Sequence, residues 1–231
     1  MTRARSDARP HLNQPGGRER ASGHPAIRGR ERELRRLADG VRRLVAATVA
    51  NGADAAETAR FADDAHALAD RLEARCAAAP PPRYGGEPPD GVLEPHDVFP
   101  YDPVLGIYSP LALPVEMEYA DGLAVGRARF TTPYEGPPGC VHGAIIAGAF
   151  DQVFNVANIL GGAAGPTVRL DLAYERPTPL GADVVFEARI EEIGERRITT
   201  RGVLRHGDTV CVRAVGVFAR IDRARVMALR S

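Results

Sequence analysis

The sequence predicts an α+β fold in which an antiparallel sheet curls around one central helix, with a helical hairpin before it. The first observation is the order of patterns between residues 114 and 222, where two strands, one helix and four further strands follow one another. The second is that this helix is apolar nearly all round, so other elements must enclose it. The third is a pair of amphipathic helix patterns within residues 30–79.

Composition excludes several classes of protein. The 231 residues suit one domain with an appendage, and thirty arginines without any lysine balance thirty acidic residues, so a strongly basic nucleic-acid-binding protein is not expected. No apolar run approaches the roughly 18 residues of a membrane span, and the N-terminus lacks the apolar stretch of a signal peptide. Cys76, Cys140 and Cys211 lack the spacing of a disulfide framework or a zinc site, which favours the cytoplasm.

The N-terminal part divides into a tail and a hairpin. Residues 1–29 hold six arginines against two acids and very little that is apolar, so we expect a disordered basic tail. Within residues 30–79, Asn51-Gly52 separates two helix patterns, and Asp54 with Glu57 three residues on is typical of a helix start. We expect this hairpin to serve packing or oligomerisation and not chemistry. Its two apolar stripes are Leu34, Leu37, Val41, Leu44, Val45 and Val49, and Phe61, Ala65, Leu68, Leu72 and Cys76.

Residues 80–113 form a proline-rich linker, which we expect to run along the following domain because Leu105 and Tyr108 give it apolar anchors. The domain itself spans residues 114–222, and a short tail follows at 223–231. Its strands are expected at 115–119, 123–130, 167–174, 186–191, 197–205 and 210–218, and its helix at 141–160.

The residues best suited to chemistry lie where the buried helix begins. A loop rich in Gly and Pro, residues 136–142, leads directly into the helix at Gly143. A helix start leaves backbone N–H groups unpaired, and glycine lets a ligand oxygen approach them, so this start has what an oxyanion hole requires. Asp151 stands nine residues after His142, about two and a half turns along the helix. On the pattern alone, a simple turn glycine and an exposed helix acid are equally well supported.

One stripe of the helix departs from its apolar character. Asp151, Asn155 and Asn158 follow at steps of four and three residues and continue a line of small residues at Ala144, Ala147 and Gly148. Such a stripe faces either solvent or a partner that approaches closely.

Two motifs resemble one known family. The stretch 134–143, Tyr-Glu-Gly-Pro-Pro-Gly-Cys-Val-His-Gly, with Asp151 following, resembles the hotdog-fold acyl-CoA thioesterases of the phenylacetate-pathway (PaaI) type. The stretch 167–177, Thr-Val-Arg-Leu-Asp-Leu-Ala-Tyr-Glu-Arg-Pro, is similar to the third strand of that family. The resemblance covers about residues 115–221, and Ser-Pro-Leu-Ala at 109–112 is similar to actinobacterial members.

The resemblance implies an enzyme that hydrolyses an acyl-CoA or aryl-CoA thioester at sites between two subunits of a homodimer or homotetramer. It implies that the Gly143 amide supplies the oxyanion hole and that His142 shapes the loop. Asp151 of the other subunit would be the general base or the nucleophile, and Thr167 would position the water. Neither a metal nor a cofactor is implied, because coenzyme A is part of the substrate.

Three further residues are candidates for binding the acyl-CoA. Arg176 suits the CoA phosphates because its guanidinium is planar. Ala144 stands where the family usually has a second glycine, so its methyl group would narrow the acyl pocket or oppose a positive φ. Asn155 shares the polar stripe with Asp151. Cys140 lies two residues before the histidine, although a small buried thiol is the more ordinary role for it.

Two alternative functions stay open at this point. A hotdog enoyl-CoA hydratase or dehydratase pairs an acid with a histidine, and the only nearby histidine is His142. A non-catalytic acyl-CoA-binding or assembly protein would use the helical hairpin as its working part. Turnover of crotonyl-CoA without CoA release would indicate the first, and tight binding without hydrolysis the second.

Overall fold

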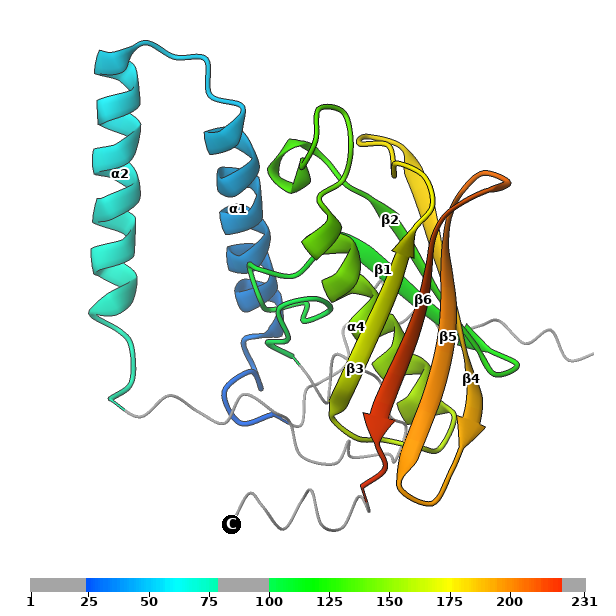
Figure 1. The fold of residues 1–231 in the computed structure, drawn as a ribbon. Coiled ribbons are helices and arrows are strands. Elements are labelled where there is room, and N and C mark those ends of the chain that lie inside the picture. The colour runs from blue at the N-terminus through cyan, green and yellow to red at the C-terminus, as the bar shows by residue number, and fades with distance from the viewer. Residues whose placement is uncertain (1–23, 79–99, 222–231) are drawn as a thin grey trace, which may run out of the picture.

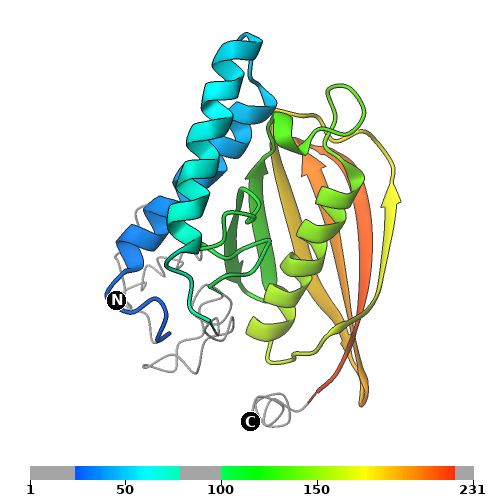
Figure 2. The same ribbon diagram turned by 90° about the vertical axis from the view of Figure 1, so that its left-hand side faces the viewer.

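The computed structural model describes residues 24–78 and 100–221 and confirms the predicted fold (Figure 1). Six strands form one antiparallel sheet in the order β1-β2-β4-β5-β6-β3, and α4 (Gly143–Leu160) lies against one face of it (Figure 2). The strands are β1 (Val115–Ala120), β2 (Leu123–Arg129), β3 (Thr167–Tyr174), β4 (Asp183–Ile193), β5 (Arg197–His206) and β6 (Thr209–Ala219). A single 3₁₀ turn, η1 (Thr132–Tyr134), precedes the helix.

The core between α4 and the sheet centres on aromatic rings. Phe150 and Phe154 of α4 have ring centroids 5.5 Å apart, and Phe150 meets Phe186 of β4 edge-on at 5.0 Å. Such edge-to-face pairs add to the free energy gained from burial. Five phenylalanines of this core are fully buried: Phe130, Phe150, Phe154, Phe186 and Phe218.

Two glycines of the sheet let α4 approach closely. A Cβ atom at Gly202 of β5 would lie 2.6 Å from the ring of Phe154, and one at Gly216 of β6 would lie 2.5 Å from it. The Phe154 ring therefore fills the volume that a side chain at either glycine would need.

α4 is covered by its own chain on every side but one. The partly open stripe runs through Ala144, Gly148, Asp151 and Asn155, as the sequence indicates. The prediction that Asn158 lies on this stripe is wrong. Asn158 is fully buried, and the Thr200 hydroxyl of β5 donates to its side-chain oxygen at 2.5 Å.

The start and the length of α4 also differ from expectation. The helix begins at Gly143, two residues late, because Val141 pairs with Glu135 in a β-bridge. The expectation that no apolar run reaches the length of a membrane span is wrong, since the 18 residues of α4 have a mean hydropathy of 1.3. Half of that helix is buried inside the fold, as in the core helix of any sheet-wrapped domain.

The N-terminal hairpin consists of α1 (Glu31–Val49) and α2 (Ala55–Glu73). Asp54 caps α2 as expected, and its carboxylate accepts a hydrogen bond from the Glu57 N–H at 2.9 Å. Figure 1 shows α1 beside the sheet domain and α2 on the far side of α1.

The segments that flank the hairpin are described only in part. Disorder up to residue 29 is the wrong expectation for residues 24–29, which form a turn with Ile27 fully buried. Residues 1–23 and 222–231 lie outside the described residues, so the rest of the expected tails does too. The described part of the linker contains buried side chains at Pro100, Leu105, Tyr108, Ser109 and Ala112.

Candidate active site

The loop before α4 is held by backbone hydrogen bonds. The His142 N–H donates to the Tyr134 carbonyl at 2.8 Å, and the Val141 N–H donates to the Thr178 carbonyl at 2.9 Å. Gly139 has a φ of 72°, a conformation that favours glycine, and its N–H donates to the Glu135 carboxylate at 2.7 Å. The loop therefore holds the start of α4 in one position.

At the start of α4, one backbone donor is left over. His142 is the N-cap, and its Nδ1 accepts a hydrogen bond from the Ala144 N–H at 3.0 Å. The His142 carbonyl accepts from Ile145 and Ile146. Among the described residues the Gly143 N–H has no acceptor, so it is free to bind an oxygen at the positive end of the helix.

The cap determines what His142 and Ala144 can do. Because Nδ1 accepts from Ala144, the neutral ring carries its proton on Nε2 and presents a donor there. The Ala144 N–H is occupied by the ring and is not available to a ligand. Ala144 has a negative φ in the first helical turn, so its methyl group does not oppose the backbone conformation.

Tyr174 at the end of β3 packs directly on Gly143. Its hydroxyl donates to the Gly143 carbonyl at 2.8 Å, and a Cβ atom at Gly143 would lie 3.3 Å from the same hydroxyl. Partial burial raises the pKa of the Tyr174 phenol, so the group stays a donor beyond the ordinary range. The sequence gives no signal for this contact, because 31 residues separate the two partners.

Asp151 and Thr167 meet, as the resemblance implies. The Thr167 hydroxyl donates to Asp151 Oδ1 at 2.6 Å, and Asp151 is partly buried on the open stripe of α4. This bond leaves Oδ2 of Asp151 and the lone pairs of the Thr167 hydroxyl for a water molecule. The pair can therefore hold a water between a proton acceptor and an orienting group.

The free donor and the acid lie far apart within one chain. Asp151 is eight residues beyond Gly143 on the same straight helix, which places it about 12 Å further along the axis. One carbonyl cannot touch both groups of the same chain.

The remaining candidates have other contacts. Asn155 donates from Nδ2 to the Asp151 carbonyl at 3.0 Å, which turns its amide towards its own helix. Arg176 is exposed and touches the Val210 carbonyl at 3.5 Å. The Cys140 thiol approaches the Pro138 carbonyl at 3.7 Å and contacts neither Asp151 nor Thr167.

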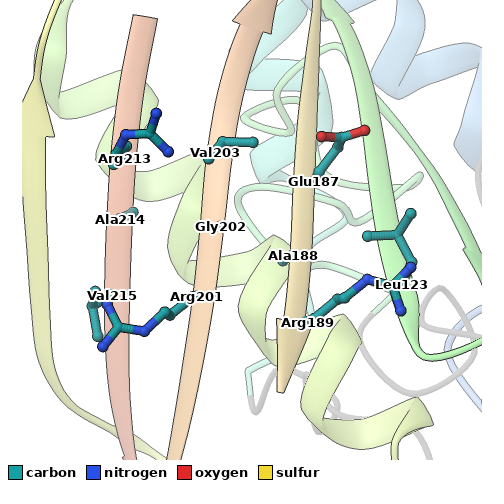
Figure 3. A pocket seen from close by; sticks show the side chains of 10 residues that line it. All are labelled: Leu123, Glu187, Ala188, Arg189, Arg201, Gly202, Val203, Arg213, Ala214 and Val215. Atoms are coloured by element: carbon teal, nitrogen blue, oxygen red, sulfur yellow. The ribbon is translucent and has the colours of Figure 1, made fainter. Parts of the chain in front are cut away.

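Two hollows are lined by none of these candidate residues, although Tyr134 and Ile145 beside the start of α4 line the larger one. One, of about 420 Å³, lies on the outer face of the sheet over Ala188, Gly202 and Ala214 (Figure 3). Two arginines on its rim are paired with acids, Arg201 with Glu191 and Arg213 with Glu175. The other, of about 800 Å³, lies between α1, the linker and η1. In the described part of the chain no group of three or more His, Cys, Asp or Glu could hold a metal ion.

This chain is similar to known thioesterases over the stretch that contains the candidate site. The profile of the thioesterase superfamily matches residues 138–213, a stretch that contains His142, Gly143, Asp151 and Thr167. Acyl-coenzyme A thioesterase THEM4 of Xenopus laevis is 34% identical over 77 residues, 33% of this chain and 35% of that protein. Acyl-coenzyme A thioesterase THEM5 of Homo sapiens is 27% identical over 90 residues, 38% of this chain and 36% of that protein. The chain thus spans about a third of the length of these curated relatives.

A solved crystal structure of a thioesterase superfamily protein is similar over most of the chain. It has 32% sequence identity and a TM-score of 0.72, and the alignment covers 90% of this chain and 98% of that one. The likeness therefore extends beyond the sheet domain into the N-terminal part.

Proposed function

Because the chain belongs to the thioesterase superfamily and has its hotdog fold, we propose that it hydrolyses acyl-CoA or aryl-CoA thioesters to the free acid and coenzyme A. The observation that carries this proposal is the Asp151–Thr167 hydrogen bond of 2.6 Å on the same open helix stripe that leads to the free Gly143 N–H. The curated relatives are acyl-coenzyme A thioesterases, which supports the same substrate class. Within the superfamily we assign the chain to the phenylacetate-pathway type.

In the proposed reaction, the thioester oxygen lies against the Gly143 N–H. The partial positive charge at the start of α4 stabilises the negative charge that develops on this oxygen as the carbonyl carbon becomes tetrahedral. Tyr174 supports the donor by fixing the first turn through the Gly143 carbonyl. CoA then leaves as a thiolate, so the reaction needs neither a metal nor a dissociable cofactor.

Asp151 supplies the other half of the reaction. As general base it takes a proton from the water that Thr167 orients, while the water oxygen bonds to the carbonyl carbon and the C–S bond breaks. As nucleophile it would attack the carbonyl itself and form a mixed anhydride that water hydrolyses. Rapid quenching followed by mass spectrometry of the Asp151 peptide separates the two, since only the nucleophile leaves an acyl adduct there.

The separation of about 12 Å along α4 leads us to propose a homodimer as the smallest active unit. In it, Gly143 of one chain and Asp151 of the other serve the same carbonyl. The small residues Ala144, Ala147 and Gly148 on the open stripe would let a partner approach closely. β3 is an edge strand with Val168 and Tyr174 half exposed, which supports a second chain on this side.

Mixing two inactive variants tests this arrangement. Gly143→Pro removes the donor yet suits the first helical position, and His142, with φ −63° and ψ 133°, has the conformation that a residue before proline needs. Gly143→Ala is the matched control, because it crowds Tyr174 in the same way and keeps the N–H. We expect Gly143→Pro to lower kcat by about 10²–10³-fold.

Refolded together, Gly143→Pro and Asp151→Asn chains form mixed dimers in which one of the two sites has both groups intact. Activity should then return to about a quarter of the wild-type value. Failure of the mixture to regain activity, with mixed dimers present, would place both groups in one chain and refute the two-subunit site.

The hydratase alternative is disfavoured by the His142 cap. A neutral ring with its lone pair on Nδ1 bonded to Ala144 has no free lone pair to act as a base. A panel of acyl-CoA and aryl-CoA thioesters with thiol release as readout tests the proposal directly. Release from no member of the panel, or hydration of crotonyl-CoA without release, would overturn it.

A further inference from the structure

The hairpin helices leave an apolar surface uncovered. α2 has no buried residue, although its apolar side chains at 61, 65, 68 and 72 recur at three- and four-residue steps. Phe61 is 52% exposed and Leu72 40%, while Leu44 and Val49 of α1 are 46% and 54% exposed. Six of the ten exposed large hydrophobic residues in the described chain belong to these helices: Leu37, Leu44, Val45, Val49, Phe61 and Leu72.

α1 is fixed to the sheet domain by one side only. Ala38 is buried, and the Arg42 guanidinium donates to the Ile107 carbonyl at 3.1 Å and the Ser109 carbonyl at 2.6 Å. Helix geometry turns Leu37 and Leu44 away from that side. α1 therefore holds a free apolar stripe at a fixed place, with α2 beyond it (Figures 1 and 2).

We propose that this hairpin packs on the hairpin of a second copy of the chain to form an antiparallel four-helix bundle. Both apolar stripes follow the spacing that bundle helices use. Two helices cannot enclose a core between them, whereas four can. The proposal is independent of the thioesterase activity.

Charge favours contact of α1 in one copy with α2 in the other. α1 carries five arginines against three acids, and α2 carries five acids against two arginines. In a two-fold symmetric pair, each α1 faces the partner's α2, so both contacts join opposite charges.

The hairpin lies on the β1 side of the sheet, whereas β3 forms the opposite edge (Figure 2). An assembly that uses both surfaces is a tetramer, and one that loses the hairpin contact is a dimer that retains the proposed active sites. The hairpin contact can therefore be removed without touching the chemistry.

Light scattering of the full chain tests the contact. Phe61→Ser with Leu72→Ser removes two large side chains from the stripe of α2 and should halve the particle mass, while thiol release per chain stays within about threefold. His66→Ser, on the opposite face of α2, is the control and should keep the wild-type mass. An unchanged mass in the double variant would overturn the proposal.

Charge reversal distinguishes a second copy from closure of the hairpin on itself. Arg36→Glu with Arg43→Glu makes both helices acidic, and Glu57→Arg with Asp64→Arg makes both basic; these residues flank the two stripes. Each variant alone should show the halved mass, and an equimolar mixture should regain the full mass. A mixture that stays at the halved mass would refute contact between copies, because closure within one chain cannot be rescued by mixing.

Discussion

α4 and α2 have nearly the same length, 18 and 19 residues, and opposite surroundings. α4 is wrapped by the sheet of its own chain and is open only along the stripe that carries Asp151. α2 has an equally regular apolar stripe and no buried residue. An apolar stripe therefore indicates that a helix needs a packing partner. It does not indicate whether that partner belongs to the same chain or to another one.

The largest expected effect contrasts an acid on each helix. Asp151→Asn keeps the shape of the side chain and removes its basicity, so kcat should fall by about 10²–10⁴-fold with KM little changed. Asp70→Asn, an exposed acid of α2, should leave kcat within about threefold. Steady-state kinetics on the best thioester of the panel measures both. Activity within threefold of wild type for Asp151→Asn would remove this residue from the mechanism.

The same substitution on each helix compares their packing. Phe154 is fully buried, so Phe154→Ala should lower the free energy of unfolding by about 3–5 kcal/mol. Phe61 is half exposed in its own chain, and Phe61→Ala should lower it by less than about 1 kcal/mol once the hairpin contact is already absent. Urea unfolding of both variants in the background of Arg36→Glu with Arg43→Glu, which is expected to lack the hairpin contact, gives the two values. Equal losses would mean that α2 is packed within its own chain.

A smaller effect is expected from the group that orients the water. Thr167→Val keeps the volume and loses the hydroxyl that donates to Asp151 at 2.6 Å, so kcat should fall about tenfold to a hundredfold. Thr167→Ser keeps the hydroxyl and should recover most of the loss. If Thr167→Val and Thr167→Ser lower kcat to the same extent, the volume of the side chain and not its hydrogen bond matters at this position.

The smallest effect concerns Tyr174. Tyr174→Phe removes one hydrogen bond to Gly143 and should lower kcat by about two- to tenfold. Burial raises the pKa of this phenol above its ordinary 10.0, so the wild-type side chain stays a donor up to that pH. The ratio of wild-type to Phe activity should therefore be constant from about pH 7 to pH 10 and should decrease only above it. A ratio that already falls near pH 8 would contradict this role.

Much of the fold and half of the site follow from sequence patterns. Alternation and the Asp121-Gly122 turn predict the strands, and the resemblance brings Asp151 to Thr167 across sixteen residues. The strand and turn patterns are local, and the spacing of Asp151 and Thr167 recurs within a known family. Both can therefore be recognised without knowledge of how the chain packs.

The rest depends on packing that no local pattern contains. Tyr174 reaches Gly143 only because β3 ends beside the start of α4. Asn158 leaves the open stripe because the twisted sheet covers this side of α4 near the end of the helix, although it leaves the same side partly open near the start. Ile27 is one apolar residue in a polar segment, so an average over composition hides it.

The ring of Phe154 over Gly202 and Gly216 has a consequence for how this protein can change over time. At Gly202 the Glu187 carbonyl oxygen, 2.7 Å from an added Cβ atom, excludes a side chain whatever residue stands at 154. At Gly216 the nearest atoms to an added Cβ belong to the rings of Phe154 and Phe218, at 2.5 and 2.6 Å, so positions 154, 216 and 218 are epistatic: a larger residue at 216 is excluded while the rings are present, and a smaller residue at 154 or 218 leaves a void until the glycine is replaced. Single-site libraries would therefore score all three positions as intolerant. Only joint variation would reveal the alternative packings, although the positions span more than sixty residues of the sequence.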